Sequence, residues 1–294
     1  MIQAGYRAVH QENRLLVLLV PVILVLAACA HIGTQPEIPA SDSMIAIPAG
    51  VYRSLYRSSE LNPQGPLDDA PVGLPPGQEP VGSFHLDAYQ ATNADYLAFV
   101  REQTRWRRSQ VVRLFADSQY LATWKEDLAP GPQAPAHSPV VHVSWFAAKA
   151  YCQWQGKQLP TTAQWELAAA ASETDPDGTR DPGFTRRILD WYGRPAPEVP
   201  TDVGSVYRNL WGVHDLHGSI WEWTLDFNTA LVSGESRGDS GLERNLFCGA
   251  ASIGAADTSD YAAFMRYAFR SSLQADYTVS SLGFRCARAG ANVR

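Results

Sequence analysis

The chain has 294 residues, of which 45% are hydrophobic, and its formal net charge is −6. A chain of this length and composition can bury the core of one large domain or of two small ones. Its longest basic block, "RWRR" at 105–108, is typical of a solvated helix face rather than of a phosphate-binding surface. We therefore expect no nucleic-acid partner.

The N-terminal segment has the pattern of an export signal. Arg7 and Arg14 precede an apolar run that ends in "LAAC" at 26–29. This order predicts a secretory signal peptide over residues 1–28, and the apolar run is short for a membrane span. "LAAC" resembles the lipobox of bacterial lipoproteins, which implies cleavage before Cys29 and a lipid on its sulfur. An uncleaved anchor is the alternative.

A lipid-anchored chain of this kind faces the periplasmic side of a bacterial membrane, and Ala30 after the cysteine implies the outer membrane. The Pro/Ser-rich residues 29–43 predict a linker, and residues 44–291, without a further break in composition, predict one domain. In an oxidising compartment two of the three other cysteines can pair, and their spacing alone does not decide which two. These cysteines are Cys152, Cys248 and Cys286.

Helix signals occur at three places. Residues 92–104 begin with a Thr/Asn cap, residues 144–156 have a Ser cap and a terminating Gly, and residues 161–172 have a Thr-x-x-Gln capping box. The Pro/Gly-rich stretches 62–82, 129–139 and 173–204 predict long surface loops. His142 alternates with apolar residues, which indicates a hydrogen-bonded histidine on a strand. Together these patterns predict an α+β domain with much loop.

The stretch "GVHDLHGSIWEW" at 212–223 packs two His, two carboxylates and two Trp into twelve positions. His214 and His217 beside Asp215 suggest zinc, but glycines interrupt a helix here and no third strong ligand follows. Calcium fits better, because Asp215 and Glu222 supply carboxylates and the turn between them can direct carbonyls inward. The two tryptophans are expected in the core.

Five segments of the sequence, taken in their order along the chain, can be compared with the motifs of known families. They are "MIAIPAGVYRSL", "SFHLDAYQATNADYLAFV", "PVVHVSWFAAKAYCQWQGKQLPTTAQWELAAAA", "NLWGVHDLHGSIWEW" and "SLGFRCARAG". This series resembles the formylglycine-generating enzymes, which are the sulfatase-modifying-factor proteins, over residues 44–290. The resemblance implies an irregular, loop-rich single α+β domain of the sulfatase-modifying-factor type, distantly like the C-type lectin fold.

The resemblance also implies site residues. A structural calcium ion would take the side chains of Asp215 and Glu222 and the carbonyls of Gly218 and Ile220. A disulfide would join Cys152, in "AYCQW", to Cys286, in "GFRC". A second disulfide of the family falls on Ala169 and Ser271, so both of its cysteines are absent from this chain.

The copper site of the family is not matched. In the aerobic enzymes two cysteines bind copper(I), because this ion prefers soft thiolate ligands. The resemblance places these cysteines near Gly254 and at Arg266, and the nearest thiol in this part of the sequence is Cys248. No base for Cys248 is identifiable, so it is expected to be a buried free thiol. We therefore expect neither copper nor copper-dependent formylglycine formation.

Three functions follow from these observations. The first is a non-catalytic accessory or maturation factor for another exported protein or peptide. The segments at 106–124 and 260–273 resemble accessory proteins associated with bacterial copper nitrite reductases, which suggests that partner. The second is a divergent oxidoreductase that acts on a peptide, as in siderophore maturation. The third is a lectin-like binder of glycan or peptidoglycan, suggested only by fold analogy.

Overall fold

The structure is a computed structural model that describes residues 43–53, 78–228 and 261–290. These residues belong to one compact unit, Ala40–Arg294. The expected signal peptide with Cys29, and the positions of Cys248 and Gly254, lie outside the described residues. Within the described part of the chain, no helix is long and apolar enough to cross a membrane.

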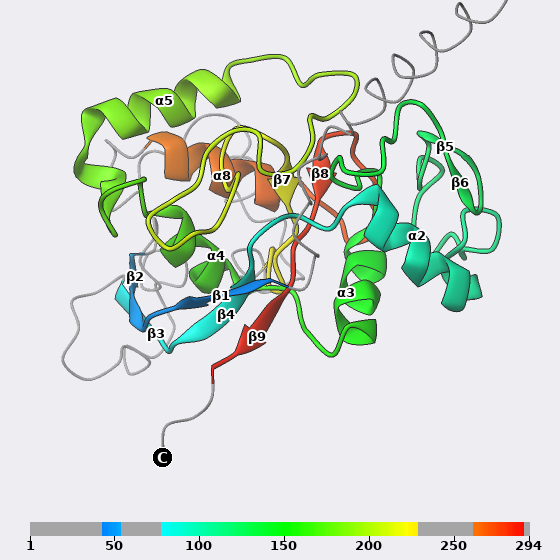
Figure 1. The fold of residues 1–294 in the computed structure, drawn as a ribbon, viewed down its shortest axis with the longest axis horizontal. Coiled ribbons are helices and arrows are strands. Elements are labelled where there is room, and N and C mark those ends of the chain that lie inside the picture. Colours follow the sequence, from blue (N-terminus) through cyan, green and yellow to red (C-terminus); the bar gives the residue numbers. More distant parts are fainter. Residues whose placement is uncertain (1–42, 54–77, 229–260, 291–294) are drawn as a thin grey trace, which may run out of the picture. The chain divides into compact units, whose positions relative to one another are not determined.

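Short strands form several small sheets (Figure 1). The largest is antiparallel, with the order β1 (Met44–Ile47), β4 (Phe84–Asp87) and β9 (Ala287–Ala289). Three two-stranded pairs accompany it: β2 (Gly50–Arg53) with β3 (Gln78–Val81), β5 (Trp124–Glu126) with β6 (Ala129–Pro130), and β7 (Trp221–Glu222) with β8 (Leu282–Gly283). Only the β7–β8 pair is parallel, so it brings the 212–223 stretch beside the C-terminal strand segment.

The three expected helices are confirmed as α2 (Asn93–Glu102), α3 (Trp145–Trp154) and α4 (Thr162–Ala169). Each begins where the sequence supplies a side-chain cap for the free N–H groups of the first turn. Thr92 and Asp95 form a reciprocal capping box on α2, and Thr161 and Gln164 form one on α4. The Ser144 hydroxyl accepts from the N–H of Ala147 at the start of α3.

The expectation of a continuous loop over 173–204 is wrong. Helix α5 (Pro182–Tyr192) and a short 3-10 helix, η3 (Gly178–Arg180), lie within it. Pro182 occupies the first turn of α5, where its missing N–H breaks no bond, and Asp181 caps the helix. The stretches 62–82 and 129–139 likewise contain β3 and β6. A further helix, α8 (Tyr261–Ser271), was not predicted.

His142 does not lie on a strand. It has a left-handed φ of 57°, and its ring Nδ1 lies 3.1 Å from the carbonyl of Thr278. The predicted hydrogen bond is therefore present without the predicted strand. Among the expected core tryptophans, Trp223 is fully buried, whereas Trp221 is half-buried.

The main core lies between α2, α3 and the C-terminal strand segment, and it is rich in aromatic rings that pack edge to face. A disulfide joins Cys152 on α3 to Cys286 just before β9, across 134 positions of sequence, and confirms the predicted pairing. A second core cluster packs β1 and β4 against α4. A third, smaller cluster lies between α5 and α8. Helix α4 therefore has β1 and β4 on one side and receives the contacts of α8 described below.

Candidate functional site

The 212–223 stretch contains a turn at Asp215, whose carboxylate is hydrogen-bonded to the preceding loop. Asp215 is fully buried and has a left-handed φ of 56°. Its carboxylate accepts hydrogen bonds from the backbone N–H groups of Gly204, Val206 and Tyr207. This carboxylate thus fixes the loop that precedes the stretch.

Glu222 lies on β7 and is the centre of a buried ion pair. Arg285 donates to both of its carboxylate oxygens, each at 2.8 Å, and both side chains are fully buried. The Trp165 indole N–H on α4 donates to the same carboxylate at 2.8 Å. The Gln90 amide donates to Glu222 Oε1 at 3.0 Å and to the Asp215 carbonyl at 2.9 Å. Each acceptor site of Glu222 is thereby used, and its charge is balanced.

These contacts test whether the residues fit calcium. All carboxylate oxygens of Asp215 and Glu222 accept hydrogen bonds, and the Asp215 carboxylate is directed to the backbone of residues 204–207. Gly218 makes the intervening turn at a φ of 87°, and Ile220 is buried after it. A calcium ion needs several free oxygens and would meet the Arg285 cation beside Glu222. This arrangement does not form a calcium shell, so the geometry disagrees with the calcium ion that the resemblance implies, and a binding experiment is needed to test it.

His217 is held as a neutral ring. Its Nε2 lies 3.0 Å from the carbonyl of Ala169, and its Nδ1 lies 3.0 Å from the Tyr192 hydroxyl. Because a carbonyl only accepts, Nε2 carries the proton and Nδ1 accepts from the tyrosine. Burial, reinforced by the nearby Arg266 cation, lowers the pKa of His217 to about 3. Both ring nitrogens are engaged, so this histidine does not present a zinc ligand.

An Arg–Glu–Arg cluster joins α8 to α4. Arg266 donates to both oxygens of Glu166, at 2.9 Å from Nε and 2.7 Å from Nη2, and Arg270 donates to Oε1 at 2.5 Å. All three side chains are at most 10% exposed. Burial alone would raise the pKa of Glu166, but the two guanidinium groups hold it below its usual range. The carboxylate therefore stays ionised, and two buried cations share it.

The Arg–Glu–Arg cluster contacts further buried polar side chains through Trp165 and Tyr192. Arg270 lies over the Trp165 ring at 4.9 Å, and Trp165 donates to Glu222. Arg266 also donates a hydrogen bond to the Tyr192 hydroxyl at 3.4 Å. The same hydroxyl is hydrogen-bonded to His217. We call this set the ionic network. Its members are Glu166, Arg266, Arg270, Tyr192, His217, Trp165, Glu222 and Arg285.

Three aromatic rings cover one side of the network. Trp221 stacks on Tyr192 at 4.7 Å between ring centres and on Phe269 at 4.4 Å. These rings come from β7, α5 and α8. All three are half-buried, so they separate the buried charges from water while keeping part of their own surface exposed.

Arg266 stands at the position where the resemblance places the second copper cysteine. A guanidinium has no lone pair to offer a metal and does not deprotonate in proteins. The Arg266 guanidinium moreover already donates hydrogen bonds to the Glu166 carboxylate. Within the described residues, no group of three or more His, Cys, Asp or Glu side chains is arranged to hold a metal ion. The chemistry that the network itself offers is charge pairing, because its acid is ionised and its histidine is neutral.

Known proteins match this chain along most of its length. The family profile described as "Sulfatase-modifying factor enzyme 1-like domain" matches residues 29–290. The chain belongs to this family. The formylglycine-generating enzyme of Mus musculus is 27% identical over 313 residues, which cover 86% of this chain and 76% of the relative. The formylglycine-generating enzyme of Streptomyces coelicolor is 31% identical over 265 residues, which cover 69% of this chain and 77% of the relative.

A further sulfatase-modifying-factor relative is named for a lack of activity. The "Inactive C-alpha-formylglycine-generating enzyme 2" of Bos taurus is 29% identical over 285 residues, which cover 83% of this chain and 87% of the relative. Among solved structures, PvdO from Pseudomonas aeruginosa aligns with a TM-score of 0.45 at 20% identity, covering 84% of this chain and 94% of that chain. The family thus includes members named as enzymes and members named as inactive.

Sequence reasoning missed most of the ionic network of this sulfatase-modifying-factor domain. Glu166, Arg270, Tyr192 and Arg285 were not singled out. One signal was available, because Arg266 and Arg270 are four residues apart and so lie on the same face of a helix. A glutamate in the apolar run "AQWELAAAA" was the other, since a buried carboxylate requires a partner.

Proposed function

We propose that this chain is a copper-independent accessory or maturation factor for another exported protein, built on the sulfatase-modifying-factor fold. The observation that carries the proposal is the buried Arg266–Glu166 pair at the position of a copper thiolate. Copper(I) needs soft thiolates, and this position supplies a cation that is already paired. The relative named as inactive supports a role of the fold without formylglycine formation.

The partner that we propose is a copper nitrite reductase. The support is the resemblance of segments 106–124 and 260–273 to accessory proteins of these reductases. The second segment contains α8, which carries Arg266 and Arg270. The ionic network would then serve to hold α8 and its surface in place for the partner.

This proposal is tested by producing a copper nitrite reductase with and without the chain in the same exporting host. We expect the reductase made without the chain to have lower activity or copper content, and the wild-type chain to restore it. Equal activity and copper content in both preparations would contradict the proposed partner. A loss of restoration in Glu166→Ala, alongside full restoration by Arg187→Ala, would show that the network matters.

We further propose that the mature chain begins at a lipid-modified Cys29 and is anchored on the periplasmic side of the outer membrane. The order of charged, apolar and "LAAC" residues supports this. Cys29→Ser should move the protein from the membrane fraction to the soluble fraction. Unchanged membrane association of this variant would rule out the lipid as the main anchor.

A further inference from the structure

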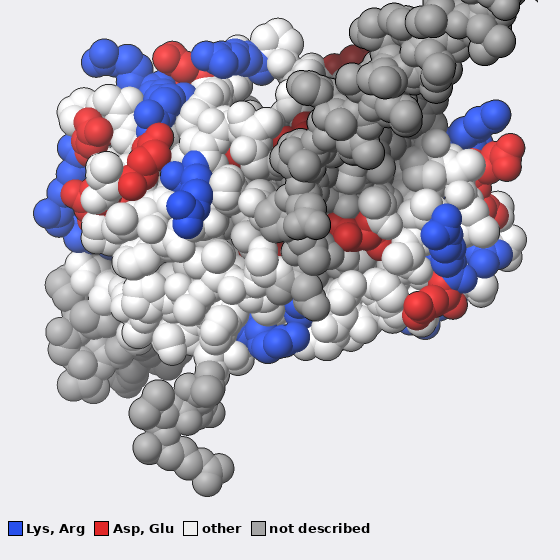
Figure 2. Space-filling model, viewed as in Figure 1, with Lys and Arg blue, Asp and Glu red and all other residues white. Residues whose placement is uncertain are grey.

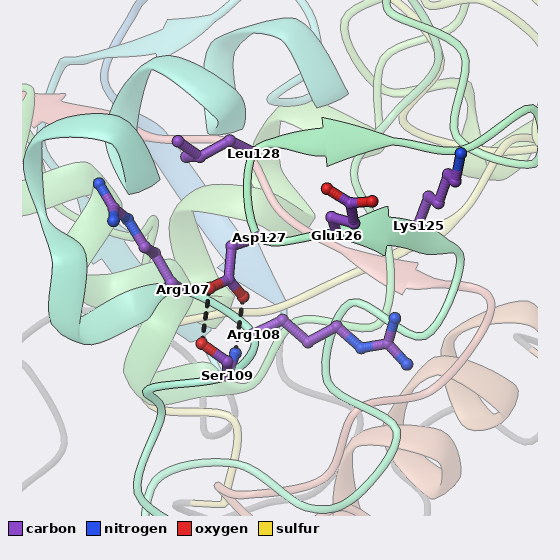
Figure 3. Close-up of a pocket in the computed structure, with 7 residues that line it drawn as sticks. All are labelled: Arg107, Arg108, Ser109, Lys125, Glu126, Asp127 and Leu128. Carbon is purple, nitrogen blue, oxygen red and sulfur yellow. Dashed lines mark hydrogen bonds between the residues drawn. The ribbon is translucent and has the colours of Figure 1, made fainter.

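A groove lies between the loop after α2 and the β5–β6 hairpin, and we call it the hairpin groove (Figure 3). It is shallow and open to solvent, with a volume of about 660 Å³. The loop contributes Arg107, Arg108 and Ser109, and the hairpin contributes Lys125, Glu126, Asp127 and Leu128. None of these residues belongs to the ionic network.

The two walls of the hairpin groove are fixed to each other. The Asp127 carboxylate accepts from both the N–H and the hydroxyl of Ser109, at 2.8 and 2.5 Å, as the dashed lines in Figure 3 show. Arg108 donates to the Trp124 carbonyl at 2.6 Å. Arg107 donates to carbonyls at the end of α2, which anchors the loop. A surface that is already rigid loses little conformational freedom when it binds a partner.

Exposed apolar side chains are concentrated in the part of the sequence that contains the groove. Four of the seven exposed large hydrophobic residues of the described chain lie within 17 positions of sequence. They are Val112, Leu114, Phe115 and Leu128, and Leu114 is 73% exposed. Phe115 packs on Trp106, the neighbour of Arg107, so the apolar loop continues into the groove wall. Of these four residues Leu128 lines the groove, so it is the apolar side chain on which the docking argument depends.

The loop wall of the groove is basic, whereas the hairpin wall carries charges of both signs. Residues 103–116 include four arginines and no acidic residue, although the chain as a whole is acidic. Lys125 has no ion-pair or hydrogen-bond partner among the described residues, whereas the Asp127 oxygens are used by Ser109. Lys125 and the exposed Leu128 lie toward opposite ends of the hairpin wall in Figure 3, so the groove offers a cationic end and an apolar end.

We propose that the hairpin groove binds an extended segment of a protein partner that presents an acidic side chain to one end of the groove and an aliphatic side chain to the other. The acidic group would pair with Lys125 and the neighbouring arginines, and the aliphatic group would cover Leu128. This inference rests on the proposed function, because a factor for exported proteins needs a surface that holds one.

The mixed charge of this side of the molecule favours a peptide over an anionic membrane. Around α2, β5 and β6, acidic and basic side chains lie next to one another (Figure 2). Glu126 lines the groove itself and would repel the closely spaced anionic headgroups of a bilayer, whereas an extended peptide can place its acidic side chain at Lys125 and a backbone N–H at Glu126.

The test uses the full mature chain and a fluorescein-labelled peptide of alternating Asp and Leu, with a Lys/Leu peptide and an Asp/Ser peptide as comparisons. Fluorescence anisotropy should show binding of the Asp/Leu peptide that weakens as sodium chloride is raised. Lys125→Glu and Leu128→Asp should each weaken it by about tenfold or more. The matched controls Arg288→Glu and Leu210→Asp, which change exposed residues outside the groove, should leave it within about twofold.

Several outcomes would overturn the proposal. They are equal binding of the Lys/Leu peptide, an equal loss of binding in the two control variants, or no binding of the Asp/Leu peptide at all. Binding of phosphatidylglycerol vesicles that Lys125→Glu and Leu128→Asp abolish, without peptide binding, would assign the surface to a membrane instead. If the peptide does not bind but the chain still raises reductase activity, the groove proposal fails and the proposed function stands.

Discussion

The guanidinium of Arg266 on α8 and the carboxylate of Glu166 on α4 form a two-pronged ion pair that is shielded from water. Helix α4 ends at Ala169 and helix α8 at Ser271, the positions at which the resemblance places the absent second disulfide. The ion pair therefore joins the same two helices that this disulfide would join. One partner of the pair, Arg266, stands at the position that the family resemblance assigns to a copper-binding cysteine.

Loss of one partner of this pair should be strongly destabilising. Glu166→Ala leaves two buried guanidinium groups without a counter-charge, and such a change costs about 3–5 kcal/mol. The measurement is the free energy of unfolding from denaturant titration. Arg187→Ala is the matched control, because its pair with Glu173 is equally short at 2.6 Å but about 40% exposed on each side. It should cost at most about 1 kcal/mol. Equal costs for the two variants would show that the Glu166 cluster contributes no special stability.

Acidification should destabilise the fold through His217 before it affects Glu166. The pKa of His217 is lowered from 6.5 to about 3, so between these values the unfolded chain binds a proton that the native ring does not. Stability due to this group is therefore lost as the pH falls below 6.5, at about 1.4 kcal/mol per pH unit. The pKa of Glu166 lies below its ordinary 4.5, so its contribution is lost only at lower pH.

The variant His217→Gln isolates this effect, because its amide can still donate to the Ala169 carbonyl. Unfolding free energies measured from pH 7 to pH 5 should fall less steeply for this variant than for the wild type. If both proteins show the same slope, His217 is not the group that takes up the proton.

Much of the fold could be predicted because its signals are local. The caps of α2, α3 and α4 depend on residues next to each helix start, whereas the Cys152–Cys286 pairing was implied by the family resemblance and not by spacing. Helix α5 was missed because Pro182 and the surrounding glycines indicate a loop, although a proline in the first helical turn breaks nothing. Its stability depends on Phe184 and Ile188, which are buried near α8, and that contact is not local.

The site was harder to predict than the fold. Glu166 and Arg266 are 100 positions apart, so no spacing rule connects them. Arg266 could be recognised only as a missing ligand, and its actual partner depends on how α8 packs. The carboxylates of Asp215 and Glu222 were predicted as calcium ligands, and the structure shows them buried and hydrogen-bonded. Asp215 takes its three backbone N–H partners from the preceding loop, whereas Glu222 takes Arg285 from 63 positions away, and this ion pair balances the Glu222 charge without a metal.

Removal of calcium tests the 212–223 stretch directly. Because Arg285 and backbone N–H groups already satisfy Glu222 and Asp215, we expect a calcium chelator to leave the melting temperature unchanged. Asp215→Ala should still lower it, since three backbone donors lose their buried acceptor. A clear drop with chelator that added calcium reverses would instead support the calcium site implied by the resemblance.

The central claim is that this member of the sulfatase-modifying-factor family does not form formylglycine with copper. The direct measurement is mass spectrometry of a sulfatase-type cysteine peptide incubated with the copper-loaded domain, a reductant and oxygen. The Streptomyces coelicolor formylglycine-generating enzyme serves as the positive control. Because Arg266 is paired with Glu166 and cannot act as a thiolate, the peptide mass should stay unchanged. Conversion of the cysteine to formylglycine, at a rate proportional to the concentration of this protein, would contradict the account.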